Sequence, residues 1–282
     1  MRLLTRSTAY ATLLLIFVGS LVTSTGSGLA VPDWPLSFGM VFPPMIGGVL
    51  YEHGHRMVAA VVGLLVVVQA VVLSLNERRL WLCWLAWIAV VAIIIQGILG
   101  GLTVLWLLPT SVSVVHGMLA QTLFLLLCLI AYAQSREWKR RQRMDRRHDS
   151  WRLLAALPVV LYLQLLLGAL MRHTDSGLAI PDFPLIGGSV FPAFNERMMS
   201  NINADRFALL LEPVERGQVI VHFLHRVGAI ATLVVVIFIN VALRIRSTTS
   251  SIISILWWIN ALVLAQVTLG ALTVLTMRSV LI

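Results

Sequence analysis

Charged residues and cysteines are both scarce in this sequence. Only 12% of its 282 residues are charged, about half the usual share of a soluble globular domain, while 59% are hydrophobic. The interior of a soluble protein of this length could not hide so much apolar surface, so a soluble enzyme is excluded, and the same composition excludes a disordered chain. The two cysteines, Cys83 and Cys128, lie inside apolar runs, which indicates small buried side chains rather than a disulfide or a metal pair.

Long apolar runs dominate what is present. A helix needs about 20 apolar residues to cross the hydrocarbon core of a bilayer. The first run lacks a convincing small-residue cleavage site and is followed by further runs, so we expect a retained helix rather than a signal peptide. The sequence predicts an all-α integral membrane protein with seven spans, at residues 8–25, 54–75, 80–106, 111–134, 152–172, 218–243 and 250–276.

Acidic residues are the rarer charged type, and the basic ones gather in a few segments. The chain has 21 Lys and Arg against 12 Asp and Glu, a formal net charge of +9. With the N-terminus in the cytoplasm, 14 of the 21 basic residues fall on the cytoplasmic face, in agreement with the positive-inside rule. The densest run, at 136–147, is therefore predicted to be a solvated loop that sets the orientation, with anionic lipid as an optional neighbour. The charge gives no support to nucleic-acid binding.

The sequence contains an internal repeat. Residues 19–36, which end in Gly-Leu-Ala-Val-Pro-Asp-Trp-Pro-Leu, recur 149 positions later as a near copy that ends in Gly-Leu-Ala-Ile-Pro-Asp-Phe-Pro-Leu. Residues 96–105 recur at 266–275, an offset of 170, so the second copy carries 21 extra residues in its outer loop, after Pro192. The repeated unit has four spans, and an even number of spans gives both copies the same orientation in the membrane.

The repeat predicts two tandem four-helix bundle halves in parallel orientation. We assign residues 1–134 to the first half, 135–151 to a basic cytoplasmic linker and 152–282 to the second half, which has only three spans. The repeat partner of His116 would fall at position 286, so we expect the sequence to stop just before an eighth helix. A truncated sequence is the simpler explanation, and a naturally seven-helix protein is the alternative.

Three histidines have the positions expected of heme-iron ligands. Ionisable side chains inside a membrane are costly and often functional. His55 lies just inside the outer end of the second span and His116 lies about six residues into the fourth, so both imidazoles are predicted at similar depth near the outer face. Two helices of one bundle that offer imidazoles at one level can ligate a heme from both sides. His225 repeats His55 in the second half.

An arginine directly follows two of these histidines, as Arg56 and Arg226. At the outer interface a guanidinium can pair with a heme propionate. The simpler interpretation is a long side chain that reaches the interface with its charge.

The two halves differ at one informative place. Glu52 lies three residues before His55, and the corresponding position of the second half is His222. A carboxylate beside a heme can accept a proton or stabilise developing positive charge. The simpler interpretations are a carboxylate favoured by the helix dipole for Glu52 and a hydrogen-bonding neighbour of His225 for His222.

Together these motifs resemble the heme A synthase family. They are Glu52-x-x-His55-Arg56, the paired Pro-Asp-aromatic-Pro loops, the Gly-Gly-Leu-Thr-Val run before His116, and His222-x-x-His225-Arg226. The resemblance covers essentially the whole chain and implies eight membrane helices in two four-helix halves. It implies a bacterial plasma membrane enzyme that oxidises the ring methyl of heme O to a formyl group through hydroxylated intermediates.

For the first half, the resemblance implies that His55 and His116 flank the substrate heme, with Arg56 beside it, and that Glu52 is the catalytic carboxylate. For the second half it implies a heme b cofactor with His225 as an axial iron ligand. His222 and Arg226 would complete this cofactor site, and the family's other ligand lies on the eighth helix. Some members carry a cysteine pair in an outer loop, which this sequence lacks.

Two other functions stay open at this point. A non-enzymatic di-heme cytochrome b would explain the histidines and the duplication, but not the difference between Glu52 and His222. A transporter built on parallel repeats predicts polar, broken helices near the bilayer midplane, whereas the charged residues here lie at helix ends. Heme O and the bilayer are the expected partners, pathway logic adds the enzyme that makes heme O, and an oligomer is left open.

Overall fold

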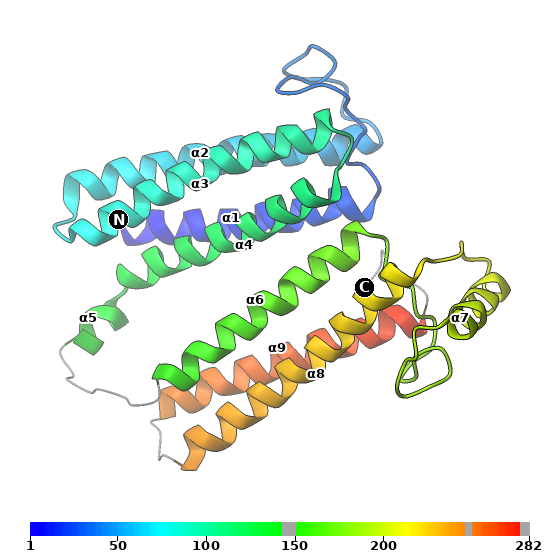
Figure 1. The fold of residues 1–282 in the computed structure, drawn as a ribbon. Coiled ribbons are helices and arrows are strands. Elements are labelled where there is room, and N and C mark those ends of the chain that lie inside the picture. The colour runs from blue at the N-terminus through cyan, green and yellow to red at the C-terminus, as the bar shows by residue number, and fades with distance from the viewer. Residues whose placement is uncertain (143–150, 246–249, 277–282) are drawn as a thin grey trace. The chain divides into compact units, whose positions relative to one another are not determined.

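The computed structural model describes residues 1–142, 151–245 and 250–276 (Figure 1). Within these ranges the chain is helical, and β-type pairing is limited to two isolated bridges in the loops. Residues 143–150 of the predicted basic linker and the last six residues lie outside the described residues. The helices are α1 (Arg2–Ser24), α2 (Gly48–Asn76), α3 (Leu80–Leu105), α4 (Thr110–Ala133), α5 (Arg136–Gln142), α6 (Trp151–His173), α7 (Glu196–Ala208), α8 (Arg216–Ile245) and α9 (Ser250–Leu275).

Seven of these helices are long and apolar enough to cross a membrane, which confirms the predicted number of spans within the described residues. The predicted starts were too late in two cases, because α1 begins at Arg2 rather than at residue 8 and α2 begins at Gly48 rather than at residue 54. Apolar runs mark the length that lipid covers, whereas backbone hydrogen bonding continues into polar residues at the helix ends.

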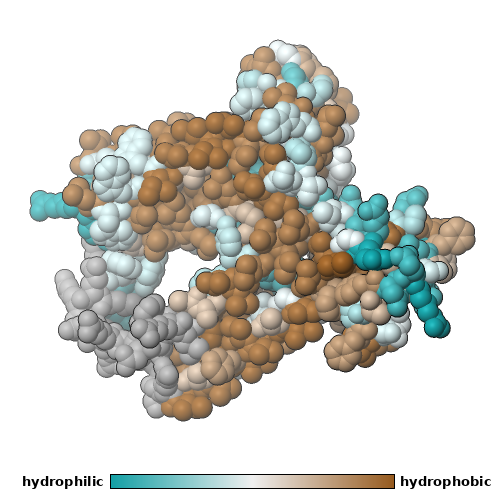
Figure 2. All heavy atoms as spheres, in the orientation of Figure 1, coloured by the Kyte–Doolittle hydropathy of each residue, from teal (hydrophilic) through white to brown (hydrophobic). Residues whose placement is uncertain are grey.

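The surface of the spanning helices is apolar. Between 6% and 28% of the residues in each apolar window are buried inside the structure. Large apolar side chains such as Leu64, Trp84 and Ile94 are exposed, and Figure 2 shows the hydrophobic colour extending along the helices. So much exposed apolar surface is stable in lipid rather than in water. The chain is therefore a multi-pass membrane protein.

The chain divides into two compact units, Met1–Arg146 and Arg147–Ile282. In the first unit, α1 packs against α2 and α4, and α3 packs against the same two helices. The four helices therefore form a closed ring in which α2 and α4 are diagonally opposite.

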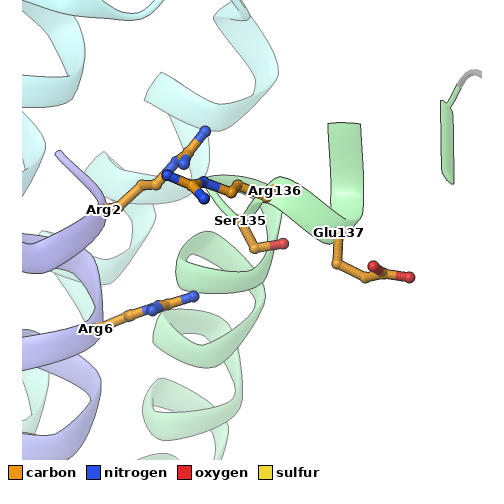
Figure 3. Close-up of a pocket in the computed structure, with 5 residues that line it drawn as sticks. All are labelled: Arg2, Arg6, Ser135, Arg136 and Glu137. Carbon is orange, nitrogen blue, oxygen red and sulfur yellow. The ribbon is translucent and has the colours of Figure 1, made fainter. Parts of the chain in front are cut away.

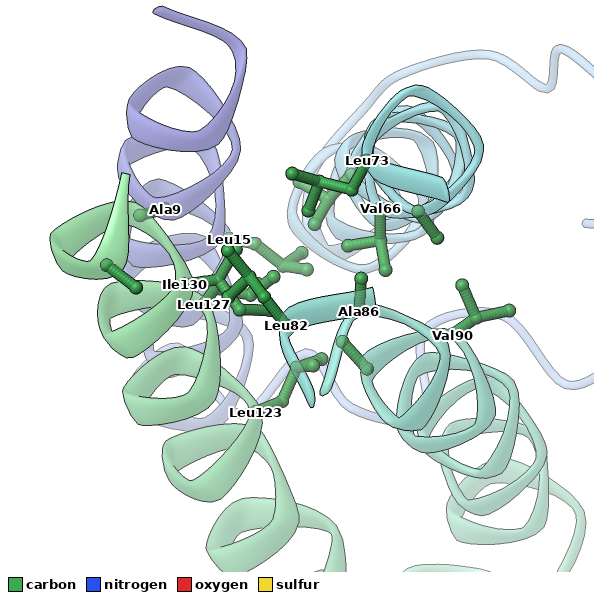
Figure 4. Packing of buried hydrophobic residues seen from close by; sticks show 14 residues of the cluster. Ala9, Leu15, Val66, Leu73, Leu82, Ala86, Val90, Leu123, Leu127 and Ile130 are labelled. Carbon is green, nitrogen blue, oxygen red and sulfur yellow. The ribbon is translucent and has the colours of Figure 1, made fainter. Parts of the chain in front are cut away.

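The apolar core of the first unit lies between these four helices (Figure 4), toward one end of the bundle. That end contains the start of α1 and the end of α4. Its fully buried members include Val62, Val66, Leu73, Leu82, Leu123, Leu127 and Ile130. Gly19, His55 and His116 lie toward the other ends of their helices and are not members of this cluster.

In the second unit, α8 packs against both α6 and α9. The 21 extra residues found by the repeat comparison contain α7, which the sequence analysis did not predict. Its N-cap is Asn195, whose side chain accepts a hydrogen bond from Met198 N at 2.9 Å. Buried apolar side chains of α7, such as Ile202, join a cluster with Ile180 and Ile186 of the preceding loop.

Candidate catalytic and heme-binding site

Glu52 is buried near the start of α2, with 4% of its surface exposed. Its Oε2 accepts a hydrogen bond from Val31 N at 2.8 Å, and its Oε1 accepts one from Arg56 Nη2 at 2.6 Å. Both carboxylate oxygens therefore have a fixed donor, one of them charged. The first turn of α2 contains no acidic residue, so the helix dipole does not account for Glu52.

Arg56 also anchors the outer loop at residues 25–47. Its Nη1 donates to Asp33 O at 2.8 Å and to Leu36 O at 2.9 Å. The Asp33 carboxylate in turn accepts bonds from Gly39 N and Phe38 N, which hold the pKa of Asp33 below its usual value. The loop is thus closed on itself and tied to α2 by one guanidinium. The predicted pairing of Arg56 with a propionate stays a prediction.

The same arrangement recurs in the second unit. His222 is 3% exposed, and Ile180 N donates toward its Nδ1 at 3.2 Å. Arg226 Nε donates toward His222 Nε2 at 3.1 Å, and Arg226 Nη1 donates to Leu185 O at 2.9 Å. Ile180 and Leu185 are the repeat partners of Val31 and Leu36 at the offset of 149, and Asp182 accepts the two backbone bonds that Asp33 accepts in the first loop.

In each unit a backbone amide and an arginine form a two-donor cradle, and this pair of donors suits a carboxylate better than an imidazole. A neutral imidazole accepts a hydrogen bond at only one of its two nitrogens. A carboxylate accepts at both oxygens, so Glu52 satisfies both donors of its cradle whereas His222 can satisfy one of the two that face it. With both ring nitrogens facing donors, His222 is poorly placed to bind iron directly.

Each of the three candidate iron ligands faces a glycine. A Cβ added to Gly19 of α1 would lie 2.9 Å from His55 Cε1. A Cβ added to Gly100 of α3 would lie 3.3 Å from His116 Cε1, so a neighbouring helix supplies the space for each ring. His55 Nδ1 is buried and has no hydrogen-bond partner among the described residues. Since α2 and α4 are diagonally opposite, these two imidazoles belong to opposite sides of one bundle.

His225 of α8 repeats this pattern, because a Cβ on Gly168 of α6 would lie 3.2 Å from its Cε1. Gln164 Nε2 lies 3.2 Å from His225 Nδ1, 3.4 Å from His225 Nε2 and 3.0 Å from His225 O. The glycine gives the His225 ring space, but both ring nitrogens face the Gln164 amide, and the role of His225 as an axial ligand stays a prediction. No group of three His, Cys, Asp or Glu gathers in the described ranges, as a bare metal ion would need, whereas heme iron needs only axial ligands.

The sequence analysis assigned no role to His53, which the structure places beside the site. His53 is 6% exposed, and its Nδ1 lies 2.7 Å from Ser37 Oγ. Ser37 Oγ also lies 3.4 Å from Arg56 Nη1. The repeat alignment carried the signal, because the partners of Ser37 and His53 are the apolar Ile186 and Phe223.

A separate cleft of about 520 Å³ opens at the opposite end of the first unit (Figure 3). Arginines from α1 and α5 converge on it. Its lining residues are Arg2, Arg6, Ser135, Arg136 and Glu137. The cleft contains no histidine and lies at the other end of α1 from Gly19, so we assign it no part in heme binding.

Comparison with known proteins places the chain in a family. Residues 48–282 match the family model described as cytochrome oxidase assembly protein, COX15-CtaA. A heme A synthase from Symbiobacterium thermophilum is 30% identical over 92% of this chain and 81% of its own length. One from Lysinibacillus sphaericus is 28% identical over 94% and 82%, and one from Alkalihalophilus pseudofirmus is 28% identical over 66% and 64%. This chain therefore belongs to the cytochrome oxidase assembly protein family, in which these relatives bear the name heme A synthase.

Proposed function

We propose that this protein is a heme A synthase, which oxidises the ring methyl of heme O to a formyl group through hydroxylated intermediates. The main support for the proposal is that the same pair of hydrogen-bond donors, a backbone amide and an arginine, faces a different side chain in each unit. In the first unit two donors hold a carboxylate, Glu52, and in the second unit the equivalent donors face His222. Two electron-transfer sites of the same kind would not need this difference.

The substrate is assigned to the first unit, between His55 and His116. Both rings lie toward the end of the bundle away from the apolar core, and each faces a glycine of a neighbouring helix, at position 19 or 100. A flat macrocycle ligated from both sides suits this arrangement. The long isoprenoid tail of heme O favours a site that opens to lipid, and the spanning helices present such an apolar surface.

Glu52 is assigned the proton chemistry. Oxidation of a methyl group removes protons as well as electrons, so a fixed base beside the ring edge is useful. The Val31 amide and Arg56 keep the Glu52 carboxylate in one orientation and disfavour its rotation away from the substrate. The same carboxylate would stabilise positive charge that develops as the methyl carbon is oxidised.

The second unit is assigned the cofactor. A heme b bound there would supply an outlet for electrons. His225 would hold it, with Gln164 and Gly168 fixing the position of the imidazole. Arg226 ties the second outer loop to α8 and would close that side of the site.

The orientation follows from charge. We assign the N-terminus to the cytoplasm and both heme sites to the outer part of the bacterial plasma membrane, because this places most Lys and Arg on the cytoplasmic side. The enzyme that makes heme O is a reasonable partner, since its product is insoluble in water and must reach the site through the membrane.

Heme analysis tests the function directly. The chain is expressed in membranes supplied with heme O, and the extracted hemes are separated by chromatography and identified by mass. Heme A or its hydroxylated precursor, absent from an empty-vector control, is expected for the wild type. Glu52→Gln should retain heme and lose conversion, whereas Glu77→Gln, a matched change at the other end of α2, should convert normally. Heme-loaded wild type that leaves heme O unchanged would support the alternative, a di-heme cytochrome b.

A further inference from the structure

The polar pair Ser37–His53 occupies a place that the second unit fills with apolar side chains. His53 lies on α2 next to Glu52, and Ser37 lies in the outer loop. Their repeat partners, Ile186 and Phe223, belong to or pack against the apolar cluster below the second loop. The second loop nevertheless makes the same backbone bonds to its aspartate and the same small bridge. A polar pair is therefore not required for this loop to fold.

The pair is also unfavourable for stability alone. His53 Nε2 is buried and has no hydrogen-bond partner among the described residues. A buried polar atom without a partner destabilises the folded state, whereas an apolar pair at this place would not. Retention of the polar pair in the half that carries Glu52 therefore calls for an explanation other than folding.

The explanation lies in the orientation of Arg56. A guanidinium can only donate, so Ser37 Oγ accepts from Arg56 Nη1, and its own proton is then free to point at His53 Nδ1. The network Glu52–Arg56–Ser37–His53 is thus continuous. In the second unit the equivalent arginine is turned differently, because Arg226 offers Nε to His222 and uses Nη2 for Ile180 O.

We propose that Ser37 and His53 are positioning residues for the catalytic carboxylate. Ser37 Oγ shares an Nη1 proton of Arg56 with the two loop carbonyls, and His53 orients the Ser37 hydroxyl. Together they keep Nη2 on Glu52 Oε1 rather than on a loop carbonyl. Neither residue touches the substrate in this role. The inference rests on the proposed function, in which Glu52 is the catalytic group.

The test replaces His53 in two ways, one taken from the repeat and one chosen by geometry. His53→Phe introduces the residue of the second unit, and His53→Asn restores only an acceptor at the place of Nδ1. Gln69→Ile is the matched control: Gln69 is a buried side chain of α2 whose polar atoms have no partner in the described part of the chain, and its repeat partner is Ile239. The full chain in membranes is used throughout.

Two readouts are combined. Steady-state oxidation of heme O gives kcat and KM, and the infrared carboxylate bands of Glu52, identified by subtraction of Glu52→Gln, report its orientation without turnover. His53→Phe should lower kcat about ten- to a hundred-fold with little change in KM or in the optical spectrum of bound heme, and should shift the carboxylate bands. His53→Asn should restore both readouts, and Gln69→Ile should leave both unchanged.

Three results would overturn the proposal. They are normal kcat and bands in His53→Phe, failure of His53→Asn to restore them, and an equal loss in Gln69→Ile. A wild type that makes no heme A would refute the proposed function instead, and the infrared bands of the three variants would still decide whether the pair positions Glu52.

Discussion

Glu52 and His222 occupy the same place in two copies of one loop-and-helix unit. A backbone amide and an arginine face each of them, from Val31 and Arg56 in the first unit and from Ile180 and Arg226 in the second. The distances lie between 2.6 and 3.2 Å. The two copies thus have chemically different side chains at one equivalent position. Comparison with the second copy separates what the first copy needs for folding from what it needs for another role.

Exchange of these two residues separates catalysis from folding. Glu52→His gives the first unit the side chain of the second, so the helix and loop should form and heme should bind. Conversion of heme O should fall about a hundred-fold or more, because the fixed carboxylate is lost. Bound heme is measured by the optical spectrum and conversion by chromatography of extracted hemes. Normal conversion in a heme-loaded Glu52→His variant would contradict the catalytic assignment.

Glycines opposite the histidines should be intolerant of a side chain. Gly19→Ala places a Cβ 2.9 Å from His55 Cε1, closer than real Cβ atoms approach, so the ring or α1 must move. We expect a clear loss of heme bound by the first unit, with an altered optical spectrum. Gly97→Ala is the control, because a Cβ at that helical position meets no atom within 4 Å. Equal heme content in the two variants would show that the His55 ring does not need this space.

Much of this architecture could be predicted from the sequence. Apolar runs gave the seven spans, because lipid imposes a minimum length on each helix. The constant spacing of the repeat showed that Glu52 and His222 are equivalent positions, since a duplication keeps equivalent residues in register.

Other features depend on contacts between distant segments. The amide of Val31 donates to Glu52, which is 21 positions away in the sequence, and no local sequence pattern predicts such a bond. Helix α7 was missed because it is short and polar and is held by its N-cap and its packing on the second loop. His53 received no role from the sequence, although its apolar repeat partner Phe223 already distinguished it.

Glu77 should make the first unit sensitive to acid. Its carboxylate accepts bonds from Arg79 Nε and Nη2 and from Gln134 Nε2, and these, Arg79 foremost, lower the pKa of Glu77 from 4.5 to about 2. Since the folded-state pKa is the lower one, this stabilisation is fully present above about pH 4.5. It is lost as the pH falls toward 2. Glu77→Gln should therefore lower Tm at pH 7, by an amount that corresponds to a loss of about 1 kcal/mol in the free energy of unfolding. The Tm values of the variant and the wild type should converge near pH 2.

Thermal unfolding in detergent micelles from pH 2 to pH 7, followed by circular dichroism, measures this difference. Glu137→Gln serves as the control, because the Glu137 side chain is 42% exposed and its ion pair with Arg140 spans 3.6 Å. A Tm difference between Glu77→Gln and the wild type that does not change with pH would show that the ionised carboxylate is not the source of the stabilisation.

The orientation can be read from which side of the membrane a new cysteine reacts. Glu196, at the start of α7, and Arg140, in α5, have side chains that are 89% and 69% exposed, so a thiol at either place can be labelled. Each is changed to Cys in a background in which Cys83 and Cys128 are replaced by Ala. One span, α6, lies between α5 and α7 along the chain, so α5 and α7 are on opposite sides of the membrane. With the N-terminus in the cytoplasm, α5 is on the cytoplasmic side and α7 on the outer side. A membrane-impermeant maleimide added to intact cells should therefore label Glu196→Cys and leave Arg140→Cys unlabelled until the membrane is opened. The reverse pattern would place the heme sites on the cytoplasmic side and would overturn the orientation assigned from the basic residues. Labelling of both cysteines from outside would instead contradict α6 as a membrane span.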